Sequence, residues 1–558
     1  MWVLGLNGRP VAYHDAAACL ADGAGRVVAC AEEERFTRVK HGLQTPPRNA
    51  AQFCLASAAV APEDIDVVAI GWDVPRLRRA FGGHWDHASG VELLHELVGP
   101  ELAGRMRARL EFVPHHLAHA AAAFGASGFS EAAVLIVDGQ GEDTAISVFR
   151  ADRAGGLRLV RSWSPRYSLG FLYEAATEWL GFGFLEAGKT MALAAFGRSG
   201  GPDADALIEV RDDDLVLSPA LSDSLNTDDA ESIAASWQHA LTQLAGRAAP
   251  SATPAGLPDD PAAVRVAWAA QRTVQHAMVE LAALARRATS TEALCVAGGV
   301  ALNCVANGLL GEPVYVPPVP HDAGVALGAV WTVAPPTRGE PLRPDLGFPI
   351  PSVPGKALPF EALADEVLHA GSVQVCDLEL PAVLDRLAAG EIGAIAEGRA
   401  EIGPRALGRR SIITLPRPAS VADRLNRLKV REPWRPFGPA VLEGHGDHWW
   451  EQREHLARYM VGAVHMTEKG TAIAPAVRHV DGTTRPQLVR HAENPALLYQ
   501  VLAAMEADGM PPVLVNTSFN RRGEPIVNSA RHAVEAFLAM DLEFLLLGGL
   551  LVTKPVRR

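Results

Sequence analysis

A pattern that occurs twice in the first part of the chain constrains the fold most strongly. Residues 2–35 read as an apolar strand that ends in Asn7-Gly8, followed by two alternating runs joined by a glycine-rich turn. Residues 133–163 repeat this order, with a strand that ends in Asp138-Gly139 and a second pair of alternating runs. Each copy predicts a strand, a tight polar loop and a β-hairpin.

Two such copies, each followed by helical text, predict an α/β fold with the duplicated architecture of actin, sugar kinases and heat-shock ATPases. In that architecture a nucleotide or phosphate lies between two related lobes. Two unrelated hairpins with glycine-rich turns are the alternative. Residues 292–308 favour duplication, because an apolar strand ends at Gly298-Gly299 and a helix begins near Asn303. Glycines let backbone N–H groups approach a ligand closely, and a helix N-terminus favours phosphate.

Three histidines within the six residues HHLAHA predict half of a metal site. A helix is expected from about Pro114 to Gly125. On this helix His115 and His119 lie one turn apart on the same face, whereas His116 points about 100° away. A pair of exposed or capping histidines is the alternative reading of this spacing.

Two carboxylates complete the predicted metal site. Asp138 follows the first strand of the second copy, and Asp322 precedes an Ala- and Gly-rich helix, so both are expected to face the cleft. Two histidines and two aspartates with open coordination positions suit Fe(II), Mn(II) or Zn(II) better than magnesium alone.

The segment GFLEAGKT, residues 183–190, matches the phosphate-binding pattern GxxxxGK[ST]. That motif requires a strand directly before the loop, whereas the text before this segment has a helical pattern. We therefore do not predict a nucleoside-triphosphate loop here. Lys189 remains a candidate contact to a phosphate or carbonyl in the same cleft.

A Pro- and Gly-rich connector, residues 335–359, leads to a second domain, so we predict domains at 1–350 and 351–558. Guanidinium groups bind phosphate with paired hydrogen bonds, and Pro and Gly favour tight loops, so arginine-rich loops in this domain predict an anion pocket. A solvated charged surface is the alternative. The basic residues of these loops are Arg399, Arg405, Arg409, Arg410, Lys429, Arg431, Arg435 and Arg485.

Bulk properties limit the remaining classes of function. The net charge of −13 disfavours broad binding to nucleic acid, and the six cysteines form no CxxC pair, which fits a reducing compartment. No segment reaches the roughly 18 uninterrupted apolar residues of a membrane span, and the first residues lack an export signal. We expect a cytoplasmic protein that binds neither nucleic acid nor a membrane, and an oligomer is compatible with the sequence.

Many segments, in order from residue 13 to residue 527, resemble the O-carbamoyltransferase family often called NodU/CmcH, whose members modify antibiotics and lipo-oligosaccharides. These segments are YHDAA, AEEERFTRVKHG, HHLAHA, VDGQGE, AGKTMALAAFG, AGGVALN, GPRALGRRS, RPFGPA, TRPQ and NTSFNRRGEPIV. The resemblance implies a first domain similar to tRNA threonylcarbamoyl-transfer enzymes and a second domain similar to the YrdC type, which makes carbamoyl adenylates.

The resemblance also implies a reaction. The second domain would form carbamoyl-AMP from carbamoyl phosphate and ATP with Mg²⁺. The first domain would transfer the carbamoyl group to a hydroxyl of a small-molecule acceptor, such as a sugar or polyol part of a natural product. Carbamate is a poor electrophile because its nitrogen donates into the carbonyl, so the transfer needs an AMP leaving group and stabilisation of the developing charge.

The residue roles follow from the same resemblance. His14 would be the general base for the acceptor hydroxyl, for which a pKa near its ordinary value of ~6.5 is suitable; a turn residue bonded to the backbone is the alternative. An iron ion, Fe(II), would be held by His115, His119, Asp138 and Asp322. Contacts to carbamoyl adenylate are expected from Gly139, Lys189, Gly298, Gly299 and Asn303. Contacts to carbamoyl phosphate and ATP are expected from Arg405, Lys429, Arg435, Arg485, Asn516 and Asn520.

Three other functions stay open from the sequence. A sugar-kinase-like phosphotransferase would use only the first domain, and the basic second domain and the histidine pair argue against it. A tRNA threonylcarbamoyl-transfer enzyme is closer, but the acidic balance makes tRNA a poorer partner. A ligand-binding regulator without activity is disfavoured by the intact His14 and metal-site residues.

Overall fold

The computed structural model describes residues 1–8, 14–80, 84–197, 207–219, 225, 228–336, 342–350, 373–451, 453–491 and 496–554. The chain forms two compact units. The first unit comprises Met1–Thr37 and His41–Leu342, and the second comprises Arg38–Lys40 and Arg343–Arg558. The predicted boundary between residues 350 and 351 borders on residues outside the described ranges, so it stays a prediction.

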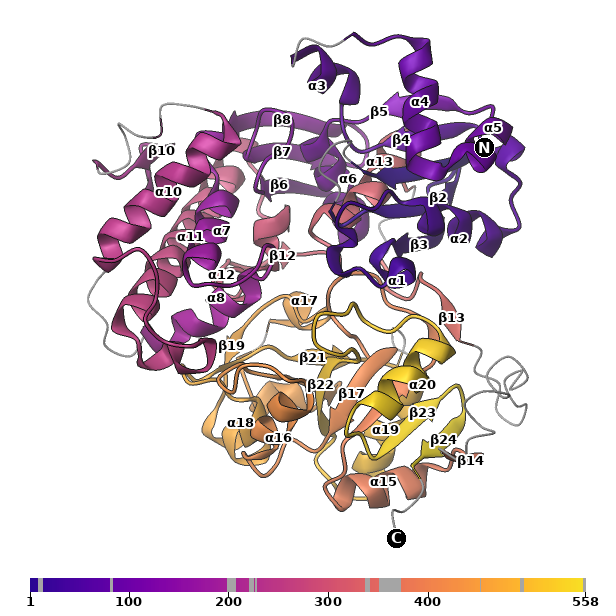
Figure 1. Ribbon diagram of the computed structural model, residues 1–558, viewed down its shortest axis with the longest axis vertical. Coiled ribbons are helices and arrows are strands. Elements are labelled where there is room, and N and C mark those ends of the chain that lie inside the picture. Colours follow the sequence, from indigo (N-terminus) through magenta and orange to yellow (C-terminus); the bar gives the residue numbers. More distant parts are fainter. Residues whose placement is uncertain are drawn as a thin grey trace. The chain divides into compact units, whose positions relative to one another are not determined.

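The first unit contains two five-stranded sheets (Figure 1). The strands of one sheet are β1 (Trp2–Asn7), β2 (Ala17–Asp22), β3 (Val27–Glu32), β4 (Val67–Ile70) and β5 (Arg109–Phe112). Those of the other are β6 (Glu131–Val137), β7 (Ile146–Asp152), β8 (Gly156–Trp163), β11 (Leu294–Ala297) and β12 (Val314–Tyr315). A small hairpin is formed by β9 (Ile208–Arg211) and β10 (Asp214–Leu217).

The two sheets share one topology. Their strand orders are β3-β2-β1-β4-β5 and β12-β11-β6-β7-β8. In each sheet three antiparallel strands come first, and two later strands then pair in parallel beside the first strand. The duplication predicted from the sequence is therefore confirmed, and Asn7 and Asp138 lie at equivalent strand ends.

Helices surround these sheets. The first sheet is followed or flanked by α1 (Glu34–Thr37), α2 (Arg48–Ala58), α3 (Val74–Ala80), α4 (His87–Val98) and α5 (Pro100–Arg105). The rest of the unit contains α6 (His115–Ser127), α7 (Leu169–Trp179), α8 (Ala187–Ala194), α10 (Ala230–Ala245), α11 (Pro261–Thr289), α12 (Cys304–Asn307) and α13 (Val325–Val333). The long α11 packs against β6 and β7 and also against α7 and α10 (Figure 1).

The contact between α6 and α13 positions the candidate site. Helix α6 lies on the second sheet, α13 lies on β1, β2 and β4 of the first sheet, and the two helices pack on each other. Their backbones approach so closely that a Cβ at Gly328 would lie 1.7 Å from the carbonyl oxygen of Ala118. Only glycine fits such an approach. This packing brings the histidines of α6 close to Asp322, which immediately precedes α13.

The end predicted for α6 is wrong. The helix does not stop at Gly125 but continues to Ser127, and Gly128 ends it with a positive φ of 81°. Gly125 is explained by packing instead, because a Cβ there would lie 2.4 Å from the ring of Trp331. The sequence signal was a real close contact that was misread as a helix stop.

The second unit is also α/β. Its strands are β13 (Pro349–Ile350), β14 (Gln374–Asp377), β15 (Gly393–Ala396), β16 (Gly398–Arg399), β17 (Arg410–Thr414), β18 (Gly438–Leu442), β19 (Val464–His465), β20 (Thr483–Thr484), β21 (Gln487–Val489), β22 (Val513–Ser518), β23 (Phe544–Leu547) and β24 (Leu550–Thr553). Its helices are α15 (Leu380–Ala388), α16 (Val421–Leu428), α17 (Glu454–Ala457), α18 (Glu468–Ile473), α19 (Ala496–Ala507) and α20 (Ala530–Ala539). The main sheet has eight strands in the order β14-β24-β23-β15-β17-β22-β18-β21.

Both faces of this sheet are buried. Along β15, Ala394 and Ala396 belong to one apolar core and Ile395 to another, and along β17 Ile412 and Ile413 divide in the same way. Successive side chains of a strand point to opposite faces, so the two cores lie on opposite sides of the sheet. Helices α16 and α20 contribute to the first core, and α15 and α19 to the second. An α/β second unit is confirmed, and its assignment to the YrdC type stays a prediction.

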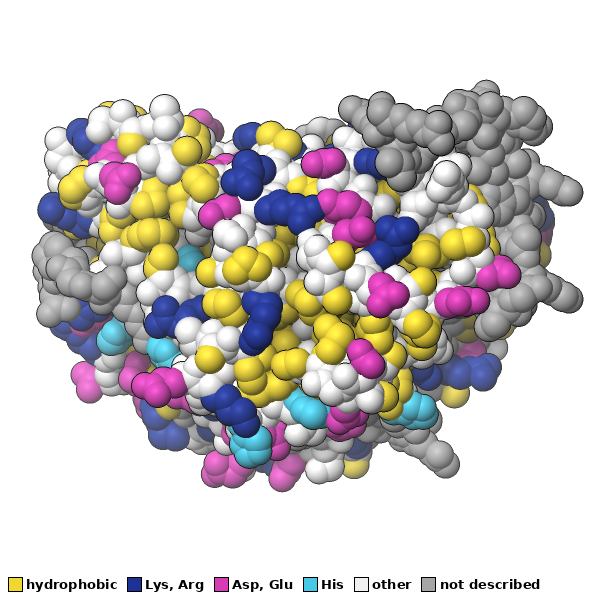
Figure 2. Space-filling view, turned by 90° about the horizontal axis from the view of Figure 1, so that it is seen from below, with side chains coloured by type: hydrophobic (Ala, Val, Ile, Leu, Met, Phe, Trp, Pro, Cys, Tyr) yellow, Lys and Arg dark blue, Asp and Glu magenta, His cyan; other side chains and the backbone are white. Residues whose placement is uncertain are grey.

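The surface and the helices carry two further observations. On the face that Figure 2 presents, basic and acidic side chains of the described residues are interspersed rather than gathered into one basic patch. Across the described parts of the chain, no helix has the length and apolar character needed to cross a membrane.

Candidate functional site

Four side chains of the first unit converge as a candidate metal centre. The ligand atoms offered by His115, His119, Asp138 and Asp322 all lie within 4.8 Å of one another. Asp138 Oδ2 lies 3.3 Å from His115 Nε2 and 3.2 Å from His119 Nε2. Asp322 Oδ1 lies 3.5 Å from each of the same nitrogens. The structure thus brings together the whole set that the sequence predicted.

The ring of His115 is held with its Nε2 toward this centre. Its Nδ1 lies 3.2 Å from the carbonyl oxygen of Gly71, which can only accept, so Nδ1 carries a hydrogen and Nε2 is the nitrogen available to a cation. The ring also stacks on Trp72 at 3.8 Å between centroids. At the start of α6, the backbone N–H of His115 donates to Glu142, which also accepts from Asp73 N–H. Glu142 was not singled out from the sequence, although it lies in the segment VDGQGE.

Asp138 is oriented by the backbone. Its Oδ1 accepts from the N–H groups of Gly139 at 2.8 Å and Gly299 at 2.9 Å, which leaves Oδ2 facing the histidines. Gly298 has a φ of 94°, and a Cβ on it would lie 2.2 Å from the carbonyl oxygen of Val137. The double glycine after β11 therefore allows the close approach by which Gly299 holds the carboxylate.

The residues present fit a divalent cation. All four side chains are buried, the two imidazoles and two carboxylates converge, and backbone groups orient His115 and Asp138. Although burial lowers the pKa of His115, the charge of Asp322 and the hydrogen bonds to both aspartates outweigh it and raise the pKa to about 10. Burial would raise the pKa of Asp138, but the hydrogen bonds from His115 and His119 hold it well below its usual range. A cation would take the place of the shared protons, as expected for metal binding.

His116 does not belong to the centre, as its helical position predicted. Its Nδ1 lies 2.8 Å from the hydroxyl of Ser147. Burial lowers its pKa to about 3, so this ring is neutral. The pair of adjacent histidines thus divides into a candidate metal-site residue and a residue that packs against the second sheet.

His14 lies beside the metal centre. Its Nδ1 is 3.9 Å from Asp322 Oδ2 and 3.4 Å from Asp15 Oδ2, and its ring meets Phe184 edge to face at 6.1 Å. Burial lowers its pKa, but Asp15, Asp322 and Asp138 outweigh burial and raise the pKa to about 9. The ordinary value assumed from the sequence therefore does not hold for the protein without metal. A cation on the aspartates would offset their charge and return the pKa of His14 toward its ordinary value.

Two other residues expected at this site have protein partners. Lys189 Nζ lies 2.7 Å from Glu186 Oε2 and 5.1 Å from the ring centroid of Phe182. Asn303 accepts from Ala306 N–H at the start of α12 and exchanges hydrogen bonds with Gln271. The loop before Lys189 follows α7 rather than a strand, which confirms that GFLEAGKT is not a nucleoside-triphosphate loop.

A second candidate site lies in the second unit, where buried cations gather. Lys429 Nζ donates to the carbonyl oxygen of Ser518 at 2.5 Å and to Asn520 Oδ1 at 2.9 Å. Burial, together with the charges of Arg431 and Arg435, lowers the pKa of Lys429 well below its usual range. Burial and the charges of Arg435 and Arg485 lower the pKa of Arg431 in the same way. An anion among these cations would relieve both effects.

Asn516 and Arg485 each have a buried polar atom that a ligand could contact. Asn516 donates from Nδ2 to the carbonyl oxygen of Ala406 at 2.9 Å and to Gln487 Oε1 at 2.6 Å, while its buried Oδ1 has no hydrogen-bond partner in the described structure. The buried Nε of Arg485 is likewise without one among the described residues. Gly438 pairs with Asn516 in the sheet and also lies against the backbone of Arg485. Asn516 and Arg485 are therefore close neighbours.

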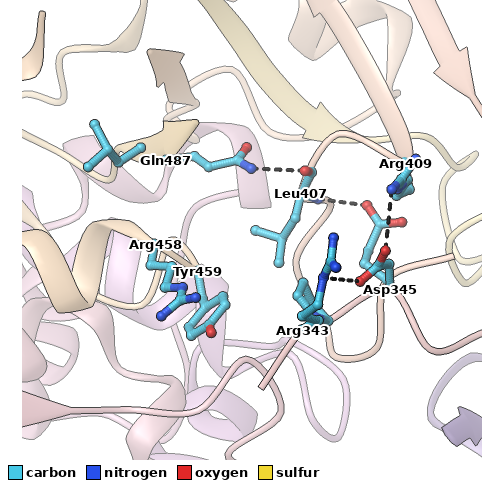
Figure 3. Close-up of a pocket in the computed structure, with 10 residues that line it drawn as sticks. Arg343, Asp345, Leu407, Arg409, Arg458, Tyr459 and Gln487 are labelled. Carbon is cyan, nitrogen blue, oxygen red and sulfur yellow. Dashed lines mark hydrogen bonds and ion pairs between the residues drawn. The ribbon is translucent and has the colours of Figure 1, made fainter. Parts of the chain in front are cut away.

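A pocket adjoins this network (Figure 3). Gln487, which accepts from Asn516, donates to the carbonyl oxygen of Leu407 at 2.8 Å, and both residues line the pocket. Arg409 and Asp345 also line the pocket and form an ion pair, which a dashed line marks in Figure 3; their nitrogen and oxygen lie 3.3 Å apart. The loop that follows β16 therefore forms part of both the pocket wall and the support of Asn516.

Not every arginine of the predicted anion pocket is available to an anion. Arg410 is fully buried and directs its guanidinium to backbone carbonyls, including those of Asn528 and Phe348. Arg399 donates to the carbonyl oxygens of Leu346 and Gly347. These side chains hold loops together. Arg405 lies in the loop between β16 and β17, partly buried, and Arg435 lies 3.4 Å from Glu432.

Comparison with known proteins identifies the family of the chain. A family model described as carbamoyltransferase N-terminus matches residues 3–80 and 91–331, and one described as carbamoyltransferase C-terminus matches residues 384–554. Nodulation protein NolNO of Sinorhizobium fredii is 32% identical over 97% of this chain and 79% of its own. A 3'-hydroxymethylcephem-O-carbamoyltransferase of Amycolatopsis lactamdurans is 30% identical over 62% of this chain and 60% of its own. The resemblance seen in the sequence is confirmed, and the chain belongs to the carbamoyltransferase family.

Proposed function

We propose that the protein is an ATP-dependent O-carbamoyltransferase that acts on a small-molecule hydroxyl. The observation that carries this proposal is the convergence of His115, His119, Asp138 and Asp322 with His14 beside them. In the second unit, the basic side chains around Lys429 and the unpartnered amide oxygen of Asn516 support a binding site for a phosphorylated carbamoyl donor. A relative is named for O-carbamoyl transfer to 3'-hydroxymethylcephem, which supports a hydroxyl acceptor.

The first half-reaction is assigned to the second unit. Water cleaves carbamoyl phosphate to carbamate and phosphate, and a carbamate oxygen then attacks the α-phosphorus of ATP, so that carbamoyl-AMP forms and pyrophosphate leaves. Carbamoyl phosphate carries both an N–H donor and a phosphate. Asn516 Oδ1 would accept a hydrogen bond from the N–H group, and Arg485 and Lys429 would bind the phosphate. Further contacts are proposed from Arg405, Arg435 and Asn520. Mg²⁺ would accompany ATP.

The second half-reaction is assigned to the first unit. His14 takes the proton of the acceptor hydroxyl, the hydroxyl oxygen attacks the carbamoyl carbon, and the bond to AMP breaks with its electron pair leaving on AMP. A divalent ion held by the two histidines and two aspartates would supply stabilisation of negative charge on the adenylate phosphate. Proposed contacts to the adenylate stay Gly139, Lys189, Gly298, Gly299 and Asn303, although the N–H groups of Gly139 and Gly299 already donate to Asp138.

The metal is proposed to be Fe(II), and the ligand set equally accepts Mn(II) or Zn(II). Elemental analysis of protein purified without chelators identifies the ion. The ion is expected at one equivalent per chain. A stoichiometry near zero after reconstitution with each of the three ions would contradict the proposed centre.

The acceptor is proposed to be a sugar or polyol part of a natural product. Beside His14, Phe184 is half-exposed and offers an apolar surface that suits the C–H face of a sugar ring. The loop that carries Phe184 is fixed, because Leu185 N–H donates to Glu174 Oε1 at 2.9 Å. Burial raises the pKa of Glu174 to about 7.

The direct test follows the nucleotide products. Purified protein is incubated with ATP, Mg²⁺, Fe(II) and carbamoyl phosphate, and with a panel of polyols, glycosides and 3'-hydroxymethylcephem. AMP, pyrophosphate and an O-carbamoylated acceptor are expected. ADP in place of AMP would show a sugar-kinase-like phosphotransferase. In a parallel reaction with threonine and tRNA, threonylcarbamoylated tRNA without any carbamoylated small molecule would show the threonylcarbamoyl-type alternative.

A further inference from the structure

Asp15 lies at the centre of three histidines, outside the metal centre. Its Oδ1 is 3.0 Å from His41 Nδ1 and 3.8 Å from His321 Nε2, and its Oδ2 is 3.4 Å from His14 Nδ1. The side chain of Asp15 is only 10% exposed. One carboxylate therefore organises histidines from three segments that are distant in the sequence.

The backbone holds Asp15 in an unfavourable conformation. Its φ is 49°, a value that side-chain-bearing residues rarely adopt. Its N–H donates to the carbonyl oxygen of His41 at 2.5 Å, and its own carbonyl accepts from Asn7 Nδ2 at 3.0 Å. Strain of this kind persists when several contacts fix it, and it concentrates at functional sites.

Hydrogen bonds also fix the loop that carries His41. His41 also has a positive φ, of 61°, and its N–H donates to Glu34 Oε2 at 2.7 Å. Glu33 accepts from the N–H groups at the start of α2, and the buried Glu32 pairs with Arg35 at 2.9 Å. Glu34 thus binds the backbone at His41, while Glu32 and Glu33 anchor the segments before and after this loop.

The charge of Asp15 is compensated within the cluster. Burial alone would raise its pKa, but His321, His14 and His41 outweigh burial and hold the pKa below its usual range. Asp15 is therefore an anion that can only accept hydrogen bonds. A histidine nitrogen that faces it must carry the hydrogen, so the Nδ1–H form of His14 is favoured and its Nε2 is left with a lone pair. A carboxylate that fixes the tautomer and orientation of a basic histidine is a recurring device in hydrolases.

Without Asp15 the ring of His14 would have another acceptor. Asp322 Oδ2 lies 3.9 Å from the same Nδ1, and Asp322 is one of the four metal-site residues. The contact of His14 Nδ1 to Asp15, at 3.4 Å, is the shorter of the two.

We propose that Asp15 is a positioning residue, which holds His14 with Nε2 toward the acceptor hydroxyl, and that His41 fixes the Asp15 carboxylate for this purpose. This inference rests on the proposed carbamoyl transfer. In the transfer step the hydroxyl proton passes to His14 Nε2 as the oxygen bonds to the carbamoyl carbon and AMP leaves. Asp15 stays ionised throughout and stabilises the protonated ring.

Two acceptors separate this role from a structural one. Transfer to glycerol requires a base, whereas methoxyamine is a neutral nucleophile at neutral pH that attacks without one. Carbamoyl transfer to each is measured with metal-loaded protein, ATP, Mg²⁺ and carbamoyl phosphate, after subtraction of the reaction without protein. Asp15→Ala is expected to lower kcat for glycerol about 100-fold, with KM changed less than about threefold, and to keep the methoxyamine rate within about threefold of wild type.

The His41 variants provide a matched pair. His41→Leu removes the hydrogen bond to Asp15 and is expected to lower glycerol transfer about tenfold, whereas His41→Asn keeps a donor toward Asp15 and restores most of it. Loss of both transfers in Asp15→Ala, loss of neither, or transfer by wild type to methoxyamine alone would overturn the inference. Wild type that forms no AMP and transfers to neither acceptor would instead show that the proposed function itself fails.

Discussion

His115 and His116 are neighbours in the chain with different surroundings, so they provide a matched pair of variants. His115→Ala removes a nitrogen that converges with His119 and both aspartates, whereas His116→Ala removes a ring bonded to Ser147. We expect metal content to fall below about a tenth of the wild-type value in His115→Ala and to stay near one equivalent in His116→Ala. Elemental analysis after dialysis measures both. Equal metal content in the two variants would contradict the assigned ligand set.

At this scale the sequence predicted the metal residues because their geometry follows from local rules. Spacing on a helix places His115 and His119 together, and strand ends place Asp138. The Asp15 cluster could not be predicted in this way, because His41 and His321 reach Asp15 only through the tertiary fold. Residue type alone also could not show that Arg410 binds backbone carbonyls while Lys429 lies among buried cations.

At the scale of elements, the turn after β11 requires a glycine at position 298. Gly298→Ala would place a Cβ 2.2 Å from the carbonyl oxygen of Val137 at a φ of 94°. We expect a loss of about 3 kcal/mol or more in the free energy of unfolding, together with weaker metal binding, because Gly299 no longer holds Asp138.

Gly104→Ala is the control for this change, because it lies in α5 with nothing within 4 Å of an added Cβ. Its stability is expected to stay equal to wild type or to rise slightly, since alanine favours a helix. Denaturant melts of both variants measure the difference. A Gly298→Ala protein as stable as Gly104→Ala would contradict a steric requirement for glycine at this turn.

The start of α11 gives a pH-dependent prediction. Asp260 accepts from the N–H groups of Ala262 and Ala263, and Arg247 and Ser251 also contact it. Burial would raise its pKa, but these hydrogen bonds lower it to about 2. The unfolded value is near ~3.9, so the stabilisation is fully present above about pH 5 and is lost as pH falls toward about 2.

Asp260→Asn should therefore lose about 1–2 kcal/mol at pH 7 and roughly half as much at pH 3, where the carboxyl of the unfolded wild-type chain is already mostly protonated. Unfolding of both proteins at the two pH values measures this difference. An equal loss at pH 7 and pH 3 would show that the charge of Asp260 does not stabilise α11.

The elements themselves were partly predictable. The strands and hairpins of both copies follow from apolar alternation and glycine-rich turns, and the helical pattern before Gly183 correctly excluded a phosphate loop. The end of α6 was not predictable, because Gly125 serves the packing of Trp331 and not a turn. A glycine signals a close approach or a positive φ, and the sequence does not say which.

At the scale of the whole molecule, the duplicated first unit was predictable because a strand followed by a hairpin occurs twice in the sequence. The two sheets then have the same topology in the structure. The eight-stranded sheet of the second unit mixes parallel and antiparallel pairs from strands far apart in the chain, and such pairings do not follow from local sequence patterns. Residues 38–40, moreover, belong to the second unit although they lie between two stretches of the first, which no linear boundary can express.

The division of the reaction between two units is the central claim, and one comparison of variants tests it most directly. Wild type, Arg485→Ala and His115→Ala are incubated with ATP, Mg²⁺, carbamoyl phosphate, metal and the best acceptor, and pyrophosphate and carbamoylated product are measured. We expect wild type to form both, Arg485→Ala to form neither, and His115→Ala to form pyrophosphate without carbamoylated product. Loss of pyrophosphate in His115→Ala to the same extent as in Arg485→Ala would contradict two separate sites.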